Sequence, residues 1–170
     1  SSDVCSSDLD PEFRSPVGAT CVVAGGSSRS ESVRCGLAAV PSSAEIICVH
    51  DAARPFATTE LFSRVIAAID TGVDAAIPGI NVTDTIKVVD SRGHVTNTPD
   101  RATLRAVQTP QAFRAAVLRA AHARGGDATD DAAVVEAHGG YVVVVDGEAD
   151  NRKITGAADL EWARSLAVGR

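Results

Sequence analysis

The sequence predicts an α/β fold: a Rossmann-like, mostly parallel sheet with helices on both faces and a protruding β-arm. Apolar runs typical of strands alternate with segments of helical spacing along most of the chain. The strand expected at 45–50 is apolar at its centre, as a sheet covered on both faces requires. Residues 84–108 instead alternate polar and apolar side chains around Ser91-Arg92-Gly93, which predicts a hairpin arm.

Each element has its own local signal. Short β-rich or apolar runs predict strands at 19–23, 45–50, 74–80, 141–145 and 151–155. Helix-capping residues and a proline at a first helical position predict four helix starts, at Ser30, Thr58, Pro110 and Thr129. A final helix is expected over 159–168.

Composition and charge limit the class of protein. The 170 residues are 45% hydrophobic and carry a net charge of −6, so they predict one folded domain, over 18–170, that does not bind nucleic acid. No apolar run approaches the roughly 20 residues of a membrane span. Residues 1–17 are polar and contain two prolines, and we expect a disordered or non-native tail there.

The four cysteines show neither a CxxC pair nor the spacing of a metal site. We therefore expect Cys21, Cys35 and Cys48 to act as small buried residues rather than in disulfides. A cytoplasmic location follows from this reading.

A candidate ligand site begins at His50-Asp51-Ala52-Ala53-Arg54-Pro55, directly after the apolar strand. In open α/β sheets, ligands bind in the crevice beyond the carboxyl ends of the strands. The alternative for this segment is a turn with a surface ion pair. The Gly25-Gly26 turn before a helix could admit an anion, although a plain tight turn explains it too.

Four further segments have an ordinary structural explanation beside a functional one. Asp84 to Lys87 and Asp100-Arg101 fall on the two limbs of the arm, where a solvated strand face would suffice. Thr109 and Thr129 stand near helix starts, where capping accounts for them, and Lys153 could be a surface lysine.

Taken together and in this order, the segments resemble the 2-C-methyl-D-erythritol 4-phosphate cytidylyltransferase family. The resemblance spans about residues 19–168 with natural spacing. The matching pieces are Gly25-Gly26 through Arg29, Ser32-Val33, His50 to Pro55, Asp84 to Lys87, Asp100-Arg101, Gln108 to Gln111, Thr129 to Asp131, and Asp150 to Thr155.

The resemblance implies transfer of CMP from CTP to 2-C-methyl-D-erythritol 4-phosphate, with release of pyrophosphate, for isoprenoid precursor synthesis by the non-mevalonate pathway. By similarity, the CTP-binding residues would be Gly25, Gly26, Ser32, Asp51 and Ala52. Asp51 and Ala52 would lie between the nucleotide and the sugar phosphate, with Asp51 either hydrogen-bonding ligand hydroxyls or helping to hold Mg²⁺.

The sugar phosphate, by the same resemblance, would be surrounded by Asp51, Thr85, Arg101, Thr109, Thr129 and Lys153. Arg101 and Lys153 match the pair that positions the phosphate for in-line attack, so they are the expected catalytic residues. The resemblance also implies a homodimer in which each arm reaches the pocket of the neighbouring subunit.

The start of the chain departs from the family pattern. The family begins with a strand and a Gly-rich loop containing Arg and Lys, and nothing similar precedes Ala19. We therefore expect the chain to correspond to the carboxyl-terminal two-thirds of the enzyme and to show no CMP transfer by itself. Two alternatives remain: a ribitol 5-phosphate cytidylyltransferase, and a non-catalytic fragment that binds nucleotide or dimerises.

Overall fold

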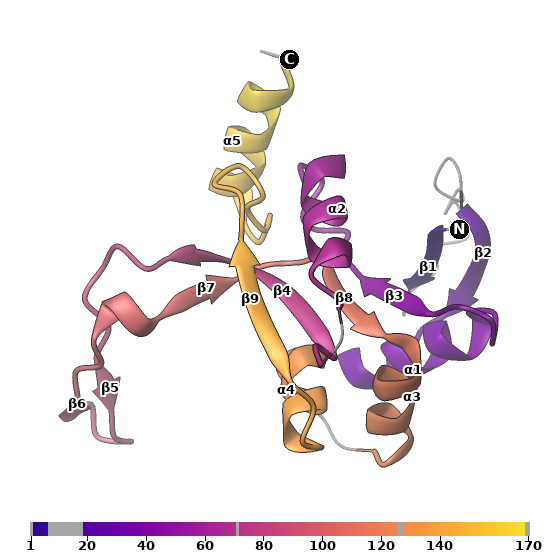
Figure 1. Ribbon diagram of the computed structural model, residues 1–170. Helices are drawn as coiled ribbons and strands as arrows, with labels where there is room; N and C mark the ends of the chain where they lie inside the picture. The colour runs from indigo at the N-terminus through magenta and orange to yellow at the C-terminus, as the bar shows by residue number, and fades with distance from the viewer. Residues whose placement is uncertain (1, 7–18, 71, 126–127, 169–170) are drawn as a thin grey trace.

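A five-stranded mixed sheet forms the centre of the protein (Figure 1). The computed structural model describes residues 2–6, 19–70, 72–125 and 128–168. The sheet contains β3 (Ile46–Val49), β4 (Ala75–Asn81), β7 (Arg105–Val107), β8 (Gln111–Arg114) and β9 (Val142–Asp146). Its order is β3-β8-β4-β7, and β9 pairs with the other edge of β4.

The prediction of a mostly parallel sheet is wrong. β8 runs antiparallel to both β3 and β4, and β7 runs antiparallel to β4, so within this sheet only the β4–β9 pair is parallel. The error arose at Pro110, which the sequence analysis placed at the start of a helix. Residues 111–114 instead form β8, because their backbone groups complete the ladders of two neighbouring strands.

Helices pack against both faces of this sheet. α1 (Arg29–Ala39), α3 (Ala115–Ala123) and α4 (Asp131–Ala137) contribute to one apolar cluster, and α2 (Thr59–Ala67) contributes to a second. Successive side chains of β4 point to opposite faces of the sheet. Ala75 and Ile77 therefore belong to the first apolar cluster, and Ala76 belongs to the second. An α/β fold with helices and a sheet is therefore present, as the alternating pattern predicted.

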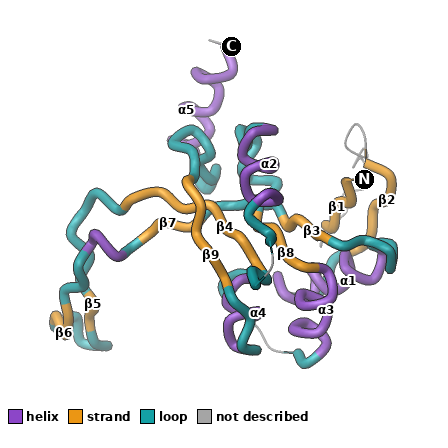
Figure 2. Tube along the Cα trace, in the orientation of Figure 1, coloured by secondary structure: helices purple, strands orange, loops and turns teal. Residues whose placement is uncertain are grey.

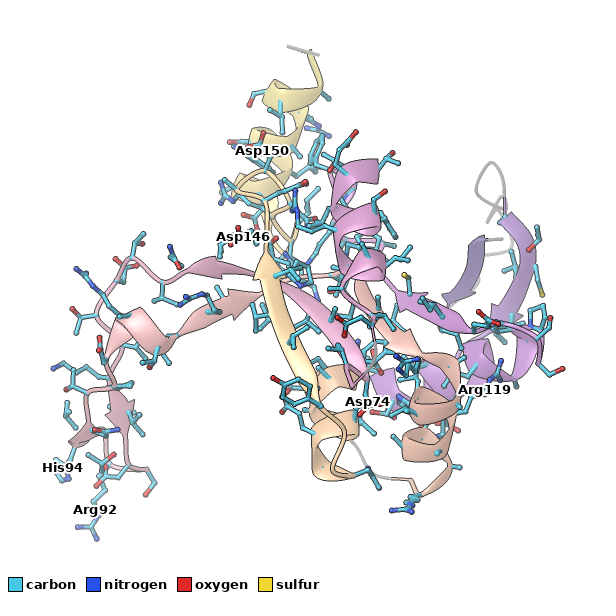
Figure 3. All side chains as sticks on the ribbon, in the orientation of Figure 1. Asp74, Arg92, His94, Arg119, Asp146 and Asp150 are labelled. Carbon is cyan, nitrogen blue, oxygen red and sulfur yellow. The ribbon has the colours of Figure 1, made fainter. Side chains whose placement is uncertain are left out.

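The segment after β9 is irregular where a fifth strand was expected. Residues 151–155 have no strand structure, and the chain reaches α5 (Ala157–Val168) through a loop (Figure 2). Asp146 and Asp150 mark the end of the sheet from which this loop leaves, and Asp74 marks the opposite end (Figure 3). The loop thus carries Lys153 past the carboxyl end of β9.

Within residues 84–108, β5 (Val88–Val89) and β6 (Val95–Asn97) form an antiparallel ladder. A 3₁₀ turn, η1 (Arg101–Thr103), precedes the return to the sheet through β7. The ladder projects away from the sheet, with Arg92 and His94 at its far end (Figures 1 and 3). Its apolar side chains Ile86, Val88, Val89 and Val95 are exposed.

Ser2–Ser6 forms strand β1, parallel to β2 (Ala19–Ala24). This pairing differs from the loose tail expected over residues 1–17, of which residues 1 and 7–17 lie outside the described residues. A polar composition does not prevent strand pairing, because the ladder is made by backbone N–H and C=O groups. Of the helices that the structure describes, none combines the length and the apolar character needed to span a membrane.

The cysteines show how burial controls thiol reactivity. Cys21, Cys35 and Cys48 are free thiols, and Cys21 on β2 is exposed, contrary to the prediction of burial. Burial raises the pKa of the Cys48 thiol on β3 to about 11. Only the thiolate is a good nucleophile, so burial suppresses alkylation of this residue.

We expect iodoacetamide at pH 8 to modify Cys21 at least about tenfold faster than Cys48, since a pKa raised by about two units lowers the thiolate fraction about 100-fold. Peptide mass spectrometry during labelling measures both rates, and labelling in urea should make them similar. Equal rates in the folded protein would contradict the burial argument.

Candidate functional site

A cavity of about 230 Å³ lies beyond the carboxyl end of β3. Its lining comes from segments far apart in the sequence: Arg29, Asp51, Arg54, Val107, Gln108, Thr109, Gln111, Thr129, Asp130 and Lys153. Four residues expected to bind the sugar phosphate are among them: Asp51, Thr109, Thr129 and Lys153. The fold therefore places one acidic, two hydroxyl and one basic side chain around a single cavity.

Asp51 and Lys153 form the ionic centre of this cavity. Lys153 Nζ lies 2.9 Å from Asp51 Oδ2, and Arg54 Nε lies 3.9 Å from the same oxygen. About half of the Lys153 side chain is exposed, at 48%, so this ion pair contributes little to stability. Its two charges are therefore accessible to a ligand.

Thr109 is fixed by a chain of hydrogen bonds. Its hydroxyl accepts a hydrogen bond from the Asp51 N–H (2.9 Å) and lies 3.0 Å from His50 Nδ1. His50 Nε2 lies 3.0 Å from the Arg54 carbonyl, which can only accept, so Nε2 carries the proton and the hydroxyl donates to Nδ1. Burial lowers the pKa of His50, which favours this neutral ring.

Arg54 and Asn151 join the two loops that carry Asp51 and Lys153. Arg54 Nη1 donates to the Asn151 carbonyl (2.8 Å). The fully buried Asn151 side chain in turn donates to the Thr109 carbonyl (2.8 Å) and to Gln108 Oε1 (3.3 Å). These bonds satisfy the amide N–H groups of the Asn151 side chain and hold the loop that precedes Lys153.

A second charged group approaches the cavity from the helical side. Arg29, the first residue of α1, places Nη2 2.7 Å from Asp131 Oδ2. His122 Nε2 on α3 lies 3.0 Å from the other oxygen of the same carboxylate. Burial opposes ionisation of Asp131, but the hydrogen bonds from His122 and Arg29 outweigh it and lower the pKa of Asp131.

We expect Asp131→Asn to lower the free energy of unfolding at pH 7 by about 3 kcal/mol, as when one partner of a buried ion pair is removed. The folded pKa is depressed, so the contribution of ionised Asp131 is present above the unfolded value, near 4. It is lost as pH falls through the lower folded value. Urea unfolding measures the free energy of unfolding of wild type and variant at pH 7 and at steps below pH 4. We expect the difference between the two proteins to become smaller as the pH falls. A difference that stays constant would contradict this assignment.

The Gly25-Gly26 turn forms a tightly packed helix start. Ser28 caps α1 by accepting from the Glu31 N–H (3.2 Å), while Glu31 Oε2 accepts from the Ser27 N–H (2.7 Å). A Cβ on Gly26 would lie 2.0 Å from Glu31 Cγ, so a side chain there requires rearrangement. The Gly26 N–H donates to Ser32 Oγ (3.1 Å).

Six predicted site residues are not part of the cavity lining: Gly25, Gly26, Ser32, Ala52, Thr85 and Arg101. Arg101 and Thr85 lie on the exposed arm, where Arg101 Nη1 donates to the Thr83 carbonyl (2.8 Å). The fold therefore does not bring Arg101 together with Lys153 of the same chain in this cavity.

Several cavity residues were not predicted as site residues: Arg29, Arg54, Val107, Gln108, Gln111 and Asp130. All of them except Val107 belong to segments that carry the family resemblance, but they were given no site role there. Gln108 and Gln111 flank Thr109-Pro110, and only 3% and 1% of these two residues are exposed. The burial of these polar residues depends on the tertiary structure and cannot be seen in a single sequence. Gln111 Nε2 donates to Asp130 Oδ2 (3.0 Å), which links β8 to the start of α4.

Within the part of the chain that the structure describes, no three His, Cys, Asp or Glu side chains gather as a metal-binding group. Asp51 and Asp130 are the carboxylates that line the cavity. One or two carboxylates suit Mg²⁺ when substrate phosphates supply further oxygens. The residues present therefore fit a cation shared with a phosphate ligand rather than a cation held by protein alone.

The family model described as IspD, 2-C-methyl-D-erythritol 4-phosphate cytidylyltransferase, matches residues 4–167. The chain belongs to this family. The match includes all five segments that meet at the cavity, and it agrees with the resemblance carried by the motifs.

Individual members of the family show the extent of the match. The 2-C-methyl-D-erythritol 4-phosphate cytidylyltransferase of Rhodococcus jostii is 51% identical over 150 residues, which is 88% of this chain and 66% of that protein. The bifunctional enzyme IspD/IspF of Nitratidesulfovibrio vulgaris is 50% identical over 143 residues, or 82% of this chain and 36% of that protein. The chain thus spans less than two-thirds of the length of these relatives.

Solved structures of the family have the same fold. The 2-C-methyl-D-erythritol 4-phosphate cytidylyltransferase of Thermus thermophilus superposes with a TM-score of 0.80 at 38% identity, covering 97% of this chain and 81% of that one. The 4-diphosphocytidyl-2C-methyl-D-erythritol synthase of Anaerococcus prevotii gives 0.81 at 33% identity, covering 89% and 72%.

Proposed function

We propose that this chain contributes most of the active site of a cytidylyltransferase that moves CMP from CTP to 2-C-methyl-D-erythritol 4-phosphate. The observation that supports this function best is the cavity around Asp51, Thr109, Thr129 and Lys153 in a member of this family. In the reaction, a phosphate oxygen of the sugar phosphate bonds to the α-phosphorus of CTP. The bond from that phosphorus to the bridging oxygen breaks, and pyrophosphate leaves with the electron pair.

The cavity chemistry matches this reaction. A phosphate monoester is already a nucleophile, so the protein must position two anions and stabilise the developing charge. Lys153 acts as a point charge on the attacking phosphate, and its contact with Asp51 keeps its ammonium group at the cavity. Asp51, Thr109 and Thr129 offer hydrogen-bonding groups to the hydroxyls of the polyol.

Asp51 would also help to hold Mg²⁺, together with oxygens of the CTP phosphates. The cation would neutralise charge on the triphosphate when bound. Gly25, Gly26, Ser32 and Ala52 are proposed to face the cytidine and ribose of CTP, on the family resemblance alone.

The arm is proposed to complete the site of a second subunit in a homodimer. Its exposed valines are typical of a surface covered by a partner, and a two-stranded hairpin is only marginally stable alone. Arg101 and Thr85 would then contact the sugar phosphate bound to the neighbouring body. We place this function in the cytoplasm, with no nucleic acid or membrane partner.

CMP transfer is the direct test of this function. The chain would be fused behind the part of the Rhodococcus jostii relative that it does not match, and incubated with labelled CTP, Mg²⁺ and methylerythritol phosphate or ribitol phosphate. We expect labelled product with methylerythritol phosphate and its loss in Asp51→Asn. Arg164→Ala, on the exposed face of α5, is the matched control that should retain activity. A folded fusion that transfers CMP only to ribitol phosphate, or to neither, would overturn the proposal.

A further inference from the structure

Arg29 lines the cavity but has no role in the proposed mechanism, whereas Lys153 has one and Arg54 binds the Asn151 and Val107 carbonyls. Nη2 of Arg29 is bound by Asp131, but Nη1 is buried and has no hydrogen-bond partner among the described residues. Arg29 lines the cavity, and its side chain as a whole is 35% exposed. A part-exposed guanidinium at a cavity that also holds Lys153 is a candidate for contact with an anionic ligand.

The side chains behind Arg29 are buried and paired with one another. Asp131 is fully buried and receives hydrogen bonds from Arg29 on one oxygen and His122 on the other. His122 is 3% exposed, so this line of three side chains joins the starts of α1 and α4 to the last turn of α3. The carboxylate holds one edge of the guanidinium and so limits the directions in which Nη1 can point.

The charges at the cavity indicate an anionic acceptor. Arg29, Arg54 and Lys153 contribute three positive charges to the lining, and Asp51 and Asp130 contribute two negative ones. Asp131 binds Nη2 of Arg29, and the guanidinium has further N–H donors for an anion in the cavity. A guanidinium fork can contact a carboxylate with one nitrogen and a phosphate with another.

We propose that Arg29 is a substrate-binding residue whose guanidinium donates a hydrogen bond to the phosphate of a polyol phosphate in the cavity. Asp131 and His122 are positioning residues that act through it. This inference rests on the proposed function for the identity of the polyol phosphate, and its anion contact can be tested separately.

Calorimetric titration of the whole chain with methylerythritol phosphate, and separately with inorganic phosphate, tests the contact. Arg29→Lys keeps the charge beside Asp131 but loses the fork, and we expect the affinity for methylerythritol phosphate to fall about 10- to 100-fold, the effect of one charge-assisted hydrogen bond. Arg124→Lys, at the exposed end of α3, is the matched control and should bind as wild type does. Equal affinity of Arg29→Lys and wild type would overturn the inference and leave the proposed function standing.

The positioning role of His122 is tested by comparing two variants of this residue. His122→Gln can still donate to Asp131 from a nitrogen near the position of Nε2, whereas His122→Leu cannot. We expect near wild-type affinity in His122→Gln and about a tenfold loss in His122→Leu at unchanged secondary structure. Similar losses in both variants would overturn the positioning role.

The NMR resonance of the Arg29 guanidinium in isotope-labelled wild-type protein provides a test that does not depend on the folding of any variant. We expect inorganic phosphate to shift it, and methylerythritol phosphate to shift it at lower concentration. If methylerythritol phosphate does not bind but phosphate shifts Arg29, the proposed substrate is wrong and the anion contact stands. If neither ligand shifts the resonance, the inference is overturned.

Discussion

Lys153→Ala is expected to lower CMP transfer about 100- to 1,000-fold, the loss seen when one preorganised donor at a developing charge is removed. The side chain lies 2.9 Å from Asp51 at the cavity, so its removal takes away a cation where the two phosphates must meet. The measurement is the initial rate of CMP transfer in the fusion described above, at saturating and at low methylerythritol phosphate.

Stability should respond far less than activity to this substitution. The Lys153 side chain is half exposed, and exposed ion pairs contribute at most about 1 kcal/mol. We therefore expect a thermal unfolding midpoint close to that of Arg164→Ala, the control on α5. A rate within about threefold of wild type in the folded variant would remove Lys153 from the mechanism.

Mixing two inactive variants should restore activity if the arm works across a dimer. Arg101→Ala and Lys153→Ala are each expected to be nearly inactive in the fusion. After subunit exchange at equal amounts, half of the dimers are mixed, and each has one site with Lys153 from one chain and Arg101 from the other. About a quarter of wild-type activity should return if the two sites are independent.

This experiment separates the two possible locations of Arg101. In the described chain, Arg101 binds the Thr83 carbonyl and is not part of the cavity lining, which is why we assign it to the neighbouring site. The rate of CMP transfer is measured before and after mixing, and exchange is verified with differently tagged chains. If exchange occurs and no activity returns, the arm serves its own subunit and the shared-site proposal fails.

The sequence alone predicted which segments would form a ligand site. Asp51, Thr109, Thr129 and Lys153 were named from motifs, and all four line one cavity. Each of these short segments has an ordinary structural explanation by itself, and the family resemblance, carried by their order along the chain, is what implied a role for these residues. The alternation of strand and helix patterns likewise predicted an α/β fold, since periodicities of 2 and 3.6 are local properties.

Strand direction and partner choice were decided only by the tertiary structure. Gln111–Arg114 forms β8 between β3 and β4, although Pro110 had suggested a helix start there. A four-residue segment carries too little local preference to choose between helix and strand. The segment forms a strand because pairing with the edges of β3 and β4 satisfies the backbone N–H and C=O groups of all three strands.

The same reason explains the contacts around the cavity that local patterns could not predict. Asp131 and His122 are nine residues apart and meet because α3 and α4 pack together, while Arg29 joins them across a separation of 102 residues. Gln108 and Asn151 pair across 43 residues. Contacts between residues so distant in sequence depend on how the helices and loops pack, and the sequence by itself determined the chemical groups but not which of them would be neighbours.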